Sequence, residues 1–490
     1  MNIKLLRLTT LFYLLLPNLL FYLFWTNTWI SSAAAVFLAR ILYAEIRDAR
    51  FSGRGSLTRK DLIKIILSAS VLCALSGVSG FAYQTNDYWA HNTKFFELFE
   101  HNWPIRIPSD GPAVGYYYGY YVVPALFSKL VGHLCEAAIF VWTVLGISLG
   151  LGWLYVALKG KLRYALLVLT FGDLAHVCVS LLTKIAGVPY AFGDFGIEVW
   201  SNFENLFWVP NQLIASLIMG GMLVYCLAER IDIETMVLPI VLSYWWAIFP
   251  AFTSSILVGI ILFSKWARYG LPTRGLIHTI LLPGLLTIPV LLLFISHQKP
   301  AVTGFIWNFP GEIKTRIIEY SLNIGVTAAF SILIFGFLSQ KIKTRTPTFP
   351  FYAVIGLIVI LPLFRIGKVN DFLFRGLMPL LIVAGFYLYQ FGPGLRAGSN
   401  PPRIKRQARI ALFCMLILST SLAATRVIRA LRYNRVSARF FPNQVHFRPV
   451  PYDTYSNVYE ALWARWSQAE ADQYLGKSGS FYETFIAPRQ

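Results

Sequence analysis

The stretch "IKIILSASVLCALSGVSGFAYQTNDYWAHNTKFFELFEHNWP", residues 63–104, joins an apolar run to a charged and aromatic segment at a sharp boundary. Its first half, residues 63–83, is long enough to cross a membrane as a helix, since about 20 apolar residues span the hydrocarbon core. Similar runs recur along the chain, which is 56% hydrophobic and only 13% charged, with a mean hydropathy of +0.58. Soluble domains carry about one quarter charged residues. The sequence therefore predicts an all-α integral membrane protein.

The apolar runs define the expected transmembrane helices. They are residues 9–26, 28–45, 63–83, 136–158, 163–183, 209–227, 236–264, 276–296, 317–339, 350–366, 374–391 and 408–424. The run 236–264 is too long for one span and contains Pro250, so we expect two short helices that meet at residues 249–251. The sequence therefore predicts about thirteen transmembrane helices.

Lysine and arginine gather in the short loops between these runs, as they do in cytoplasmic loops of membrane proteins. This distribution explains the net charge of +20 without nucleic acid as a partner. It predicts a cytoplasmic N-terminus, a retained first span and an extracytoplasmic C-terminus. The tyrosine-rich segment 114–132 would reverse this topology if it crossed the membrane. We therefore expect an interfacial helix there, because tyrosine has an apolar ring and a polar hydroxyl.

The expected topology divides the chain into three parts. Residues 1–62 form two N-terminal transmembrane helices and a basic cytoplasmic loop, and residues 425–490 form a small extracytoplasmic cap. The transmembrane core, residues 63–424, has outer loops at 84–135, 184–208, 297–316 and 366–373. These outer loops hold most acidic residues that lie outside the basic loops, so we expect a functional site at the outer surface. The cysteines lie in or beside apolar runs without a CxxC spacing, which predicts neither disulfides nor a cysteine metal site.

Asn86 and Asp87 directly follow the third run, and His91 lies one helical turn after Asp87. The spacing leaves three interpretations open. Asp87 is a helix N-cap, a general base that accepts a proton from a hydroxyl, or one ligand of a divalent metal together with His91. A metal site needs further ligands, and the sequence offers no third one.

Arg365, Lys368 and Arg375 form a group of cations next to an expected outer loop. Such cations bind the phosphate of a lipid head group, or anchor helix ends with their charges in the interface. Asp371 precedes Arg375 by one helical turn and is expected to orient it. In the segment 189–212, the candidate supporting residues are Glu198, Glu204 and Gln212.

Three motifs, "NDYWAHNTKFFELFEHNWP", "NLFWVPNQ" and "RIGKVNDFLFRGLMP", together with the tyrosine-rich "GYYVVPALFSKLVG", resemble the GT-C superfamily of polytopic glycosyltransferases. The resemblance covers about residues 63–391. GT-C enzymes use sugars linked to a polyprenyl phosphate, and their catalytic acid lies in the first outer loop, which here corresponds to Asp87. Where the family pattern has Gln-His after "WVP", this chain has Asn211-Gln212.

The resemblance implies an inverting glycosyltransferase in a bacterial cytoplasmic membrane. It would move a sugar from a polyprenyl-phosphate donor to a glycan or lipid acceptor of the cell envelope, at the outer face. Asp87 would deprotonate the acceptor, and Arg365, Lys368 and Arg375 would hold the donor phosphate, with no cofactor required. Trp89, Trp103, Trp200 and Trp208 are candidates for stacking on sugars, and anchoring in the membrane interface is the alternative for each.

Two other functions remain open at this point. A transporter or flippase of lipid-linked glycans needs charged residues near the membrane midplane, and only Arg40, Asp173 and His176 fit that position in the expected topology. A non-catalytic scaffold for envelope enzymes is the second alternative, because the segment after "WVP" departs from the family pattern.

Overall fold

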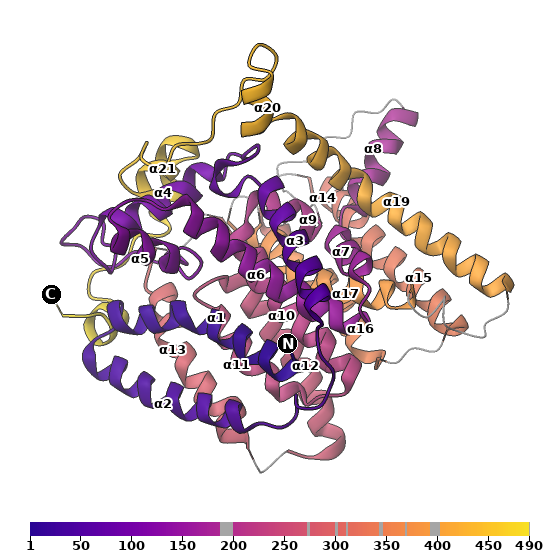
Figure 1. The fold of residues 1–490 in the computed structure, drawn as a ribbon, viewed down its shortest axis with the longest axis horizontal. Coiled ribbons are helices and arrows are strands. Elements are labelled where there is room, and N and C mark those ends of the chain that lie inside the picture. The colour runs from indigo at the N-terminus through magenta and orange to yellow at the C-terminus, as the bar shows by residue number, and fades with distance from the viewer. Residues whose placement is uncertain are drawn as a thin grey trace.

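The computed structural model describes residues 1–186, 199–271, 275–298, 302–309, 312–342, 346–367, 370–392 and 402–489. Apart from two short strands, the described elements are helical, as predicted (Figure 1). The first half contains α1 (Ile3–Phe24), α2 (Thr28–Arg47), α3 (Arg59–Leu75), α4 (Tyr88–Glu100), α5 (Val122–Val131), α6 (Glu136–Ala157), α7 (Leu162–Thr170), α8 (Leu174–Ala186), α9 (Asn202–Trp208), α10 (Pro210–Glu229) and α11 (Val237–Ser243). The second half contains α12 (Ile248–Tyr269), α13 (Leu282–Ile295), α14 (Ile313–Tyr320), α15 (Val326–Lys341), α16 (Phe349–Ile360), α17 (Met378–Tyr389), α19 (Pro402–Arg432), α20 (Arg435–Phe440), α21 (Val458–Arg465) and α22 (Gln468–Asp472).

Within the described residues, nine helices are long and apolar enough to cross a membrane, which indicates a multi-pass membrane protein. They are Ile3–Phe24, Thr28–Arg47, Glu136–Ala157, Pro210–Glu229, Ile248–Tyr269, Ile277–Ile295, Ile313–Gln340, Phe372–Tyr389 and Arg406–Arg432. The count of about thirteen stays a prediction. Two of the predicted runs, 63–83 and 350–366, form helices that are shorter than these nine. Helix α3 has 17 residues and α16 has 12.

Helix α10 forms the centre of the bundle, and 94% of its most apolar 18-residue stretch is buried. It packs between α6 and α17, and glycines allow the close approach. A Cβ atom on Gly150 of α6 would overlap the Leu217 side chain, and one on Gly220 would lie 2.7 Å from Cγ2 of Ile382 in α17. The small residues therefore set the spacing of the three central helices.

Gly150→Val should lower the stability of the folded protein by about 1–3 kcal/mol, because the added methyl groups overpack the α6–α10 contact. Gly259→Val is the matched control, since nothing lies within 4 Å of the Cβ position there. Thermal unfolding of both purified variants in detergent measures the difference. Equal midpoints for the two variants would show that the glycine contact does not limit the packing.

The run 236–264 does form two helices, but the break lies at residues 244–247, before the predicted position at 249–251. Pro250 sits in the first turn of α12, where a missing N–H breaks no helical hydrogen bond. Pro250 is therefore compatible with the start of α12 and does not cause the break. Helix α12 has 22 residues and is long enough to span a membrane alone, whereas α11 has only seven. The run therefore forms one short and one long helix, and the prediction that both are short was wrong.

The run 163–183 is interrupted between α7 and α8, which the sequence did not predict. Gly172 lies in the break with φ +151°, and a Cβ there would be 2.6 Å from Cα of Ser201. The buried Asp173 carboxylate accepts a hydrogen bond from the Ser201 backbone N–H at 2.8 Å. Arg40, which the sequence placed near the membrane midplane together with Asp173, is exposed on α2, whereas Asp173 is buried. The hydrogen bond between Asp173 in the break and Ser201, the N-cap residue of α9, therefore positions the start of α9.

The tyrosine-rich segment 114–132 differs from the expected interfacial helix. Only its second half is helical, as α5, and the tyrosine run before it is non-helical. These tyrosines are buried in the protein: Tyr116, Tyr117, Tyr118, Tyr120 and Tyr121. Four of the five hydroxyls bond to protein groups, for example Tyr118 to Glu97 at 2.7 Å, whereas the Tyr116 hydroxyl has no partner among the described residues. The aromatic rings thus build a protein core rather than a membrane interface.

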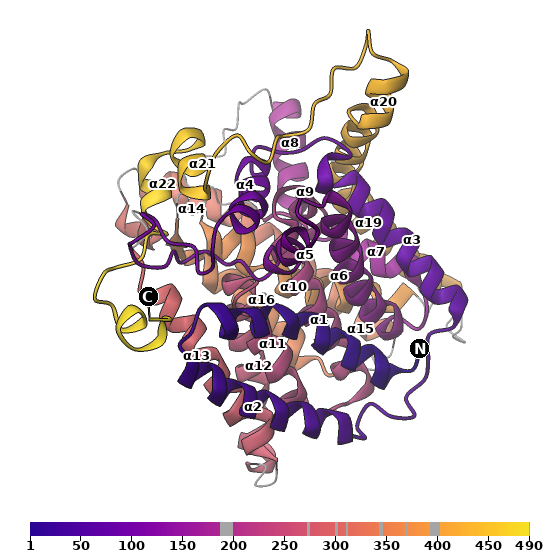
Figure 2. The same cartoon turned by 60° about the vertical axis from the view of Figure 1, so that its left-hand side comes forward.

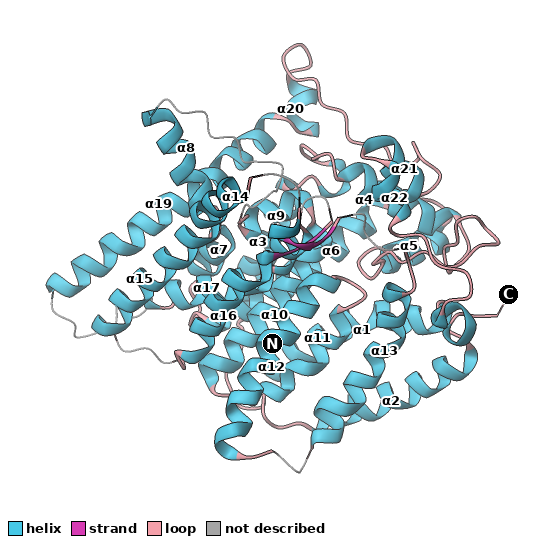
Figure 3. Cartoon of the chain, turned by 180° about the vertical axis from the view of Figure 1, so that it is seen from behind, coloured by secondary structure: helices cyan, strands magenta, loops and turns pink. Residues whose placement is uncertain are grey.

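Several segments predicted as outer loops meet at one end of the molecule. Strand β1 (Thr303–Phe305) pairs antiparallel with β2 (Phe364–Ile366), which joins two of these loops (Figure 3). The C-terminal residues 474–477 lie between 113–115 and 296–298, linked by backbone hydrogen bonds. Helix α21 packs beside α4, as Figure 2 shows. This end therefore combines segments from the whole length of the chain.

Candidate functional site

A cavity of about 440 Å³ lies among some of these segments. Its walls come from the first half of α4, the tyrosine run, α9 and the start of α10, the π-helical segment before α17, and the C-terminal helices. The lining residues fall within 86–94, 116–117, 200–212, 371–375 and 462–474. Most of the candidate residues named from the sequence, Asn86, Asp87, His91, Gln212, Asp371 and Arg375, line this one cavity.

Asp87 immediately precedes α4 but does not cap it. Its backbone is already helical, with φ −62° and ψ −17°, and its side chain makes no capping hydrogen bond. The carboxylate is therefore available to the cavity. Burial raises its pKa from 3.8 to about 6, against the opposing effects of Arg375 and Lys94, while Asp371 adds to the rise. The capping interpretation was wrong.

Two cations stand beside this carboxylate. Arg375 lies 3.1 Å from Asp371, as the one-turn spacing predicted, and donates to the Tyr117 hydroxyl at 2.8 Å. The Lys94 ammonium lies 5.3–5.4 Å from the ring centres of Tyr116, Tyr117 and Tyr121. Burial and the neighbouring Arg375 lower its pKa from 10.5 to about 8. Within the described part of the chain, Lys94 makes no hydrogen bond or ion pair, so it can bind an anion.

The His91 ring forms its hydrogen bonds with groups other than Asp87. Its Nε2 lies 2.7 Å from the Trp208 carbonyl oxygen and its Nδ1 lies 2.5 Å from the Tyr121 hydroxyl. Because a carbonyl only accepts, Nε2 carries the proton and Nδ1 accepts from the tyrosine. Burial, with the nearby cations, lowers the pKa of His91 to about 3, so the ring is neutral. Both nitrogens are occupied, which excludes the Asp87–His91 metal pair in this geometry.

Three buried carboxamides line the cavity without hydrogen-bond partners among the described residues. They belong to Asn205, Asn211 and Gln212, whose exposed fractions are 1%, 0% and 0%. An unpaired buried polar group costs about 1–3 kcal/mol, and native proteins rarely keep several together. A bound polar molecule that donates and accepts hydrogen bonds would satisfy all three.

Aromatic rings complete the walls. Trp200 and Trp208 lie 5.4 Å apart between ring centres, and Trp466 comes from the C-terminal part. Glu204 holds Trp208 in place, accepting from its indole N–H at 2.9 Å and pairing with Arg426 of α19 at 2.5 Å. Glu204 therefore acts through Trp208 and does not line the cavity itself.

Other candidate residues lie elsewhere. Arg365 is buried in β2, where its Nε donates to the Gly367 carbonyl at 3.2 Å, and it does not line the cavity. Trp89 stacks under Arg465, and the Trp103 indole bonds to the Leu98 carbonyl. Glu198 and Lys368 lie outside the described residues.

Several residues of the cavity were not predicted. Lys94 could have been found, because it follows Asp87 by two helical turns and so shares its face. Trp466, Glu470 and Tyr474 come from the segment predicted only as a cap, more than 370 residues after Asp87. No local pattern connects those positions to the site.

Within the described ranges, no three His, Cys, Asp or Glu side chains are grouped so that they could hold a metal ion. The lining of the cavity offers carboxylates, cations, carboxamides and aromatic rings. Comparisons with protein-family models, with curated proteins and with solved structures find no match for this chain.

Proposed function

We propose that this protein is an inverting glycosyltransferase that uses a polyprenyl-phosphate-linked sugar and acts from this cavity. The observation that carries the proposal is the joint placement of Asp87, two cations and three unpartnered carboxamides in one aromatic-lined space. The motifs that resemble GT-C enzymes support the same conclusion. The acceptor is a glycan or lipid of a bacterial cell envelope, and the cavity opens on the extracytoplasmic side of the cytoplasmic membrane.

The cations suit the donor phosphate. Arg375 is held in position by Asp371 and Tyr117, and Lys94 adds a second positive charge near Asp87. Arginine and lysine form strong charge-assisted hydrogen bonds to phosphate oxygens. We therefore propose Lys94 and Arg375 for the phosphate role, whereas the sequence prediction named Arg365, Lys368 and Arg375.

The neutral part of the cavity suits the sugar. Carboxamides both donate and accept, which matches the hydroxyl groups of a pyranose ring. The indoles of Trp200 and Trp208 offer flat apolar faces beside them. The combination of stacking surface and amide groups gives the donor sugar a defined orientation relative to Asp87.

In the proposed step, Asp87 accepts the proton of the acceptor hydroxyl. The hydroxyl oxygen forms a bond to the anomeric carbon from the face opposite the phosphate, and the bond between that carbon and the phosphate oxygen breaks. The bonding electrons leave with the polyprenyl phosphate, whose negative charge Lys94 and Arg375 stabilise. The anomeric configuration is inverted.

The pH dependence of sugar transfer tests this proposal. A general base has to be unprotonated, and the pKa of Asp87 is about 6. Transfer from a polyprenyl-phosphate hexose should therefore fall about tenfold for each unit of pH below 6. The purified protein, with labelled donors and an envelope acceptor fraction, provides the assay. Absence of donor turnover with the whole hexose series, or equal rates at pH 5 and 7, would contradict the proposal.

A further inference from the structure

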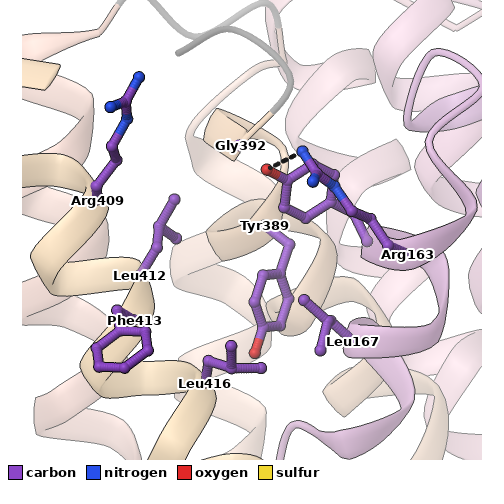
Figure 4. Close-up of a pocket in the computed structure, with 9 residues that line it drawn as sticks. Arg163, Leu167, Tyr389, Gly392, Arg409, Leu412, Phe413 and Leu416 are labelled. Carbon is purple, nitrogen blue, oxygen red and sulfur yellow. Dashed lines mark hydrogen bonds between the residues drawn. The ribbon is translucent and has the colours of Figure 1, made fainter. Parts of the chain in front are cut away.

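A second cavity, of about 480 Å³, lies between α7, the end of α17 and α19 (Figure 4). It shares no lining residue with the first cavity. Arg163 and Arg409 stand on opposite walls at one end, and Leu167, Leu412 and Leu416 line the other end (Figure 4). The cavity therefore has a charged end and an apolar end.

At the charged end, the described residues supply no counter-charge to the two arginines. Helices α7, α17 and α19 contain no aspartate or glutamate, and neither arginine has an acidic partner within the described residues. The Arg163 guanidinium instead donates to the Tyr164 hydroxyl at 3.1 Å and lies 4.6 Å from the centre of that ring. Gly392 lets the ring approach, because a Cβ there would overlap Tyr164. Arg163 is thus oriented without being neutralised.

The apolar end is bordered by a helix that is largely exposed. Helix α19 is long and apolar enough to span a membrane, yet only 17% of its most apolar 18-residue stretch is buried in the protein. Its exposed face carries Ile410, Phe413 and Ile417. Leu412 and Leu416, one turn apart, continue from Arg409 along α19, so a chain that starts at the arginines can run along them.

We propose that this cavity binds an anionic phospholipid. Its phosphate lies between Arg163 and Arg409, and an acyl chain follows Leu167, Leu412 and Leu416. The two ends of the cavity match the two ends of such a lipid, and basic pockets between membrane helices bind anionic head groups by this chemistry. The site is independent of the sugar-transfer proposal, since it uses none of the same residues.

The test uses the full-length protein, purified in detergent and stripped of lipid, with phosphatidylglycerol as the probe and phosphatidylcholine as the neutral comparison. Native mass spectrometry counts the lipids that each variant retains. The wild-type protein should retain phosphatidylglycerol preferentially, and Arg163→Gln/Arg409→Gln should weaken this binding about tenfold or more. Arg268→Gln is the matched control, because Arg268 is exposed on α12 and does not line the cavity.

Leu416→Trp provides a second variant that keeps both arginines and fills the apolar end. It should also reduce phosphatidylglycerol retention, whereas millimolar inorganic phosphate should not displace the lipid. Equal retention of the two lipids by the wild-type protein would overturn the proposal. So would unchanged retention in both cavity variants, or displacement by inorganic phosphate, which would indicate a site for free anions.

Discussion

Asp87→Asn should reduce sugar transfer by about 100-fold or more, because a positioned base contributes about that much to rate. The variant should still fold, since the Asp87 side chain caps no helix and the amide has almost the same size. Binding of polyprenyl phosphate should be unchanged or slightly tighter, because a negative charge near Lys94 and Arg375 has been removed. Initial transfer rates at saturating donor, with donor binding measured in parallel, separate catalysis from binding.

Glu100→Gln is the matched control for this change. It removes an exposed acid from the end of α4 that does not line the cavity, and it should leave the transfer rate unchanged. A near-normal rate for Asp87→Asn would remove Asp87 from the mechanism. A loss of donor binding equal to the loss of rate would make Asp87 a binding residue instead of a base.

Arg375→Gln should weaken the binding of polyprenyl phosphate by about 1.5–3 kcal/mol, or about 10–150-fold, the range for hydrogen bonds to charged groups. The substitution removes the positive charge that Asp371 and Tyr117 hold in the cavity. Titration of each purified variant with polyprenyl phosphate measures the effect. Lys94→Gln should act in the same direction, because Lys94 makes no competing ion pair among the described residues.

Arg448→Gln is the control for the arginine change, since Arg448 is exposed in the C-terminal segment and does not line the cavity. It should leave the affinity unchanged. Unchanged affinity in both Arg375→Gln and Lys94→Gln would show that the phosphate binds elsewhere. Arg375 would then serve only to satisfy the buried Asp371.

Asp87 and Arg375 could be singled out from the sequence because charged residues are rare in this apolar chain and stand at the ends of apolar runs. The pairing of Asp371 with Arg375 followed from helical spacing alone. The contribution of Trp466 and Tyr474 could not be foreseen in the same way. It depends on backbone hydrogen bonds between distant segments, such as Gly115 N–H to the Tyr474 carbonyl, which no local pattern encodes.

In the fold, too, local patterns could be predicted from the sequence, whereas contacts between distant segments could not. Long apolar runs predicted most membrane helices because their length and composition are sufficient. The break at Gly172 was not foreseen, because it arises from close contact with the Ser201 backbone, a tertiary interaction. The tyrosines of 116–121 were assigned to an interface by composition, whereas packing against other parts of the protein buries them.

The most direct test of the account is an experimental structure of the protein with polyprenyl phosphate bound. The account predicts the phosphate between Lys94 and Arg375, within hydrogen-bonding distance of both, with Asp87 beside the space that a sugar would fill. Asn205, Asn211 and Gln212 should border that space on its other side. A phosphate bound away from Lys94 and Arg375, with this cavity unchanged, would contradict the account.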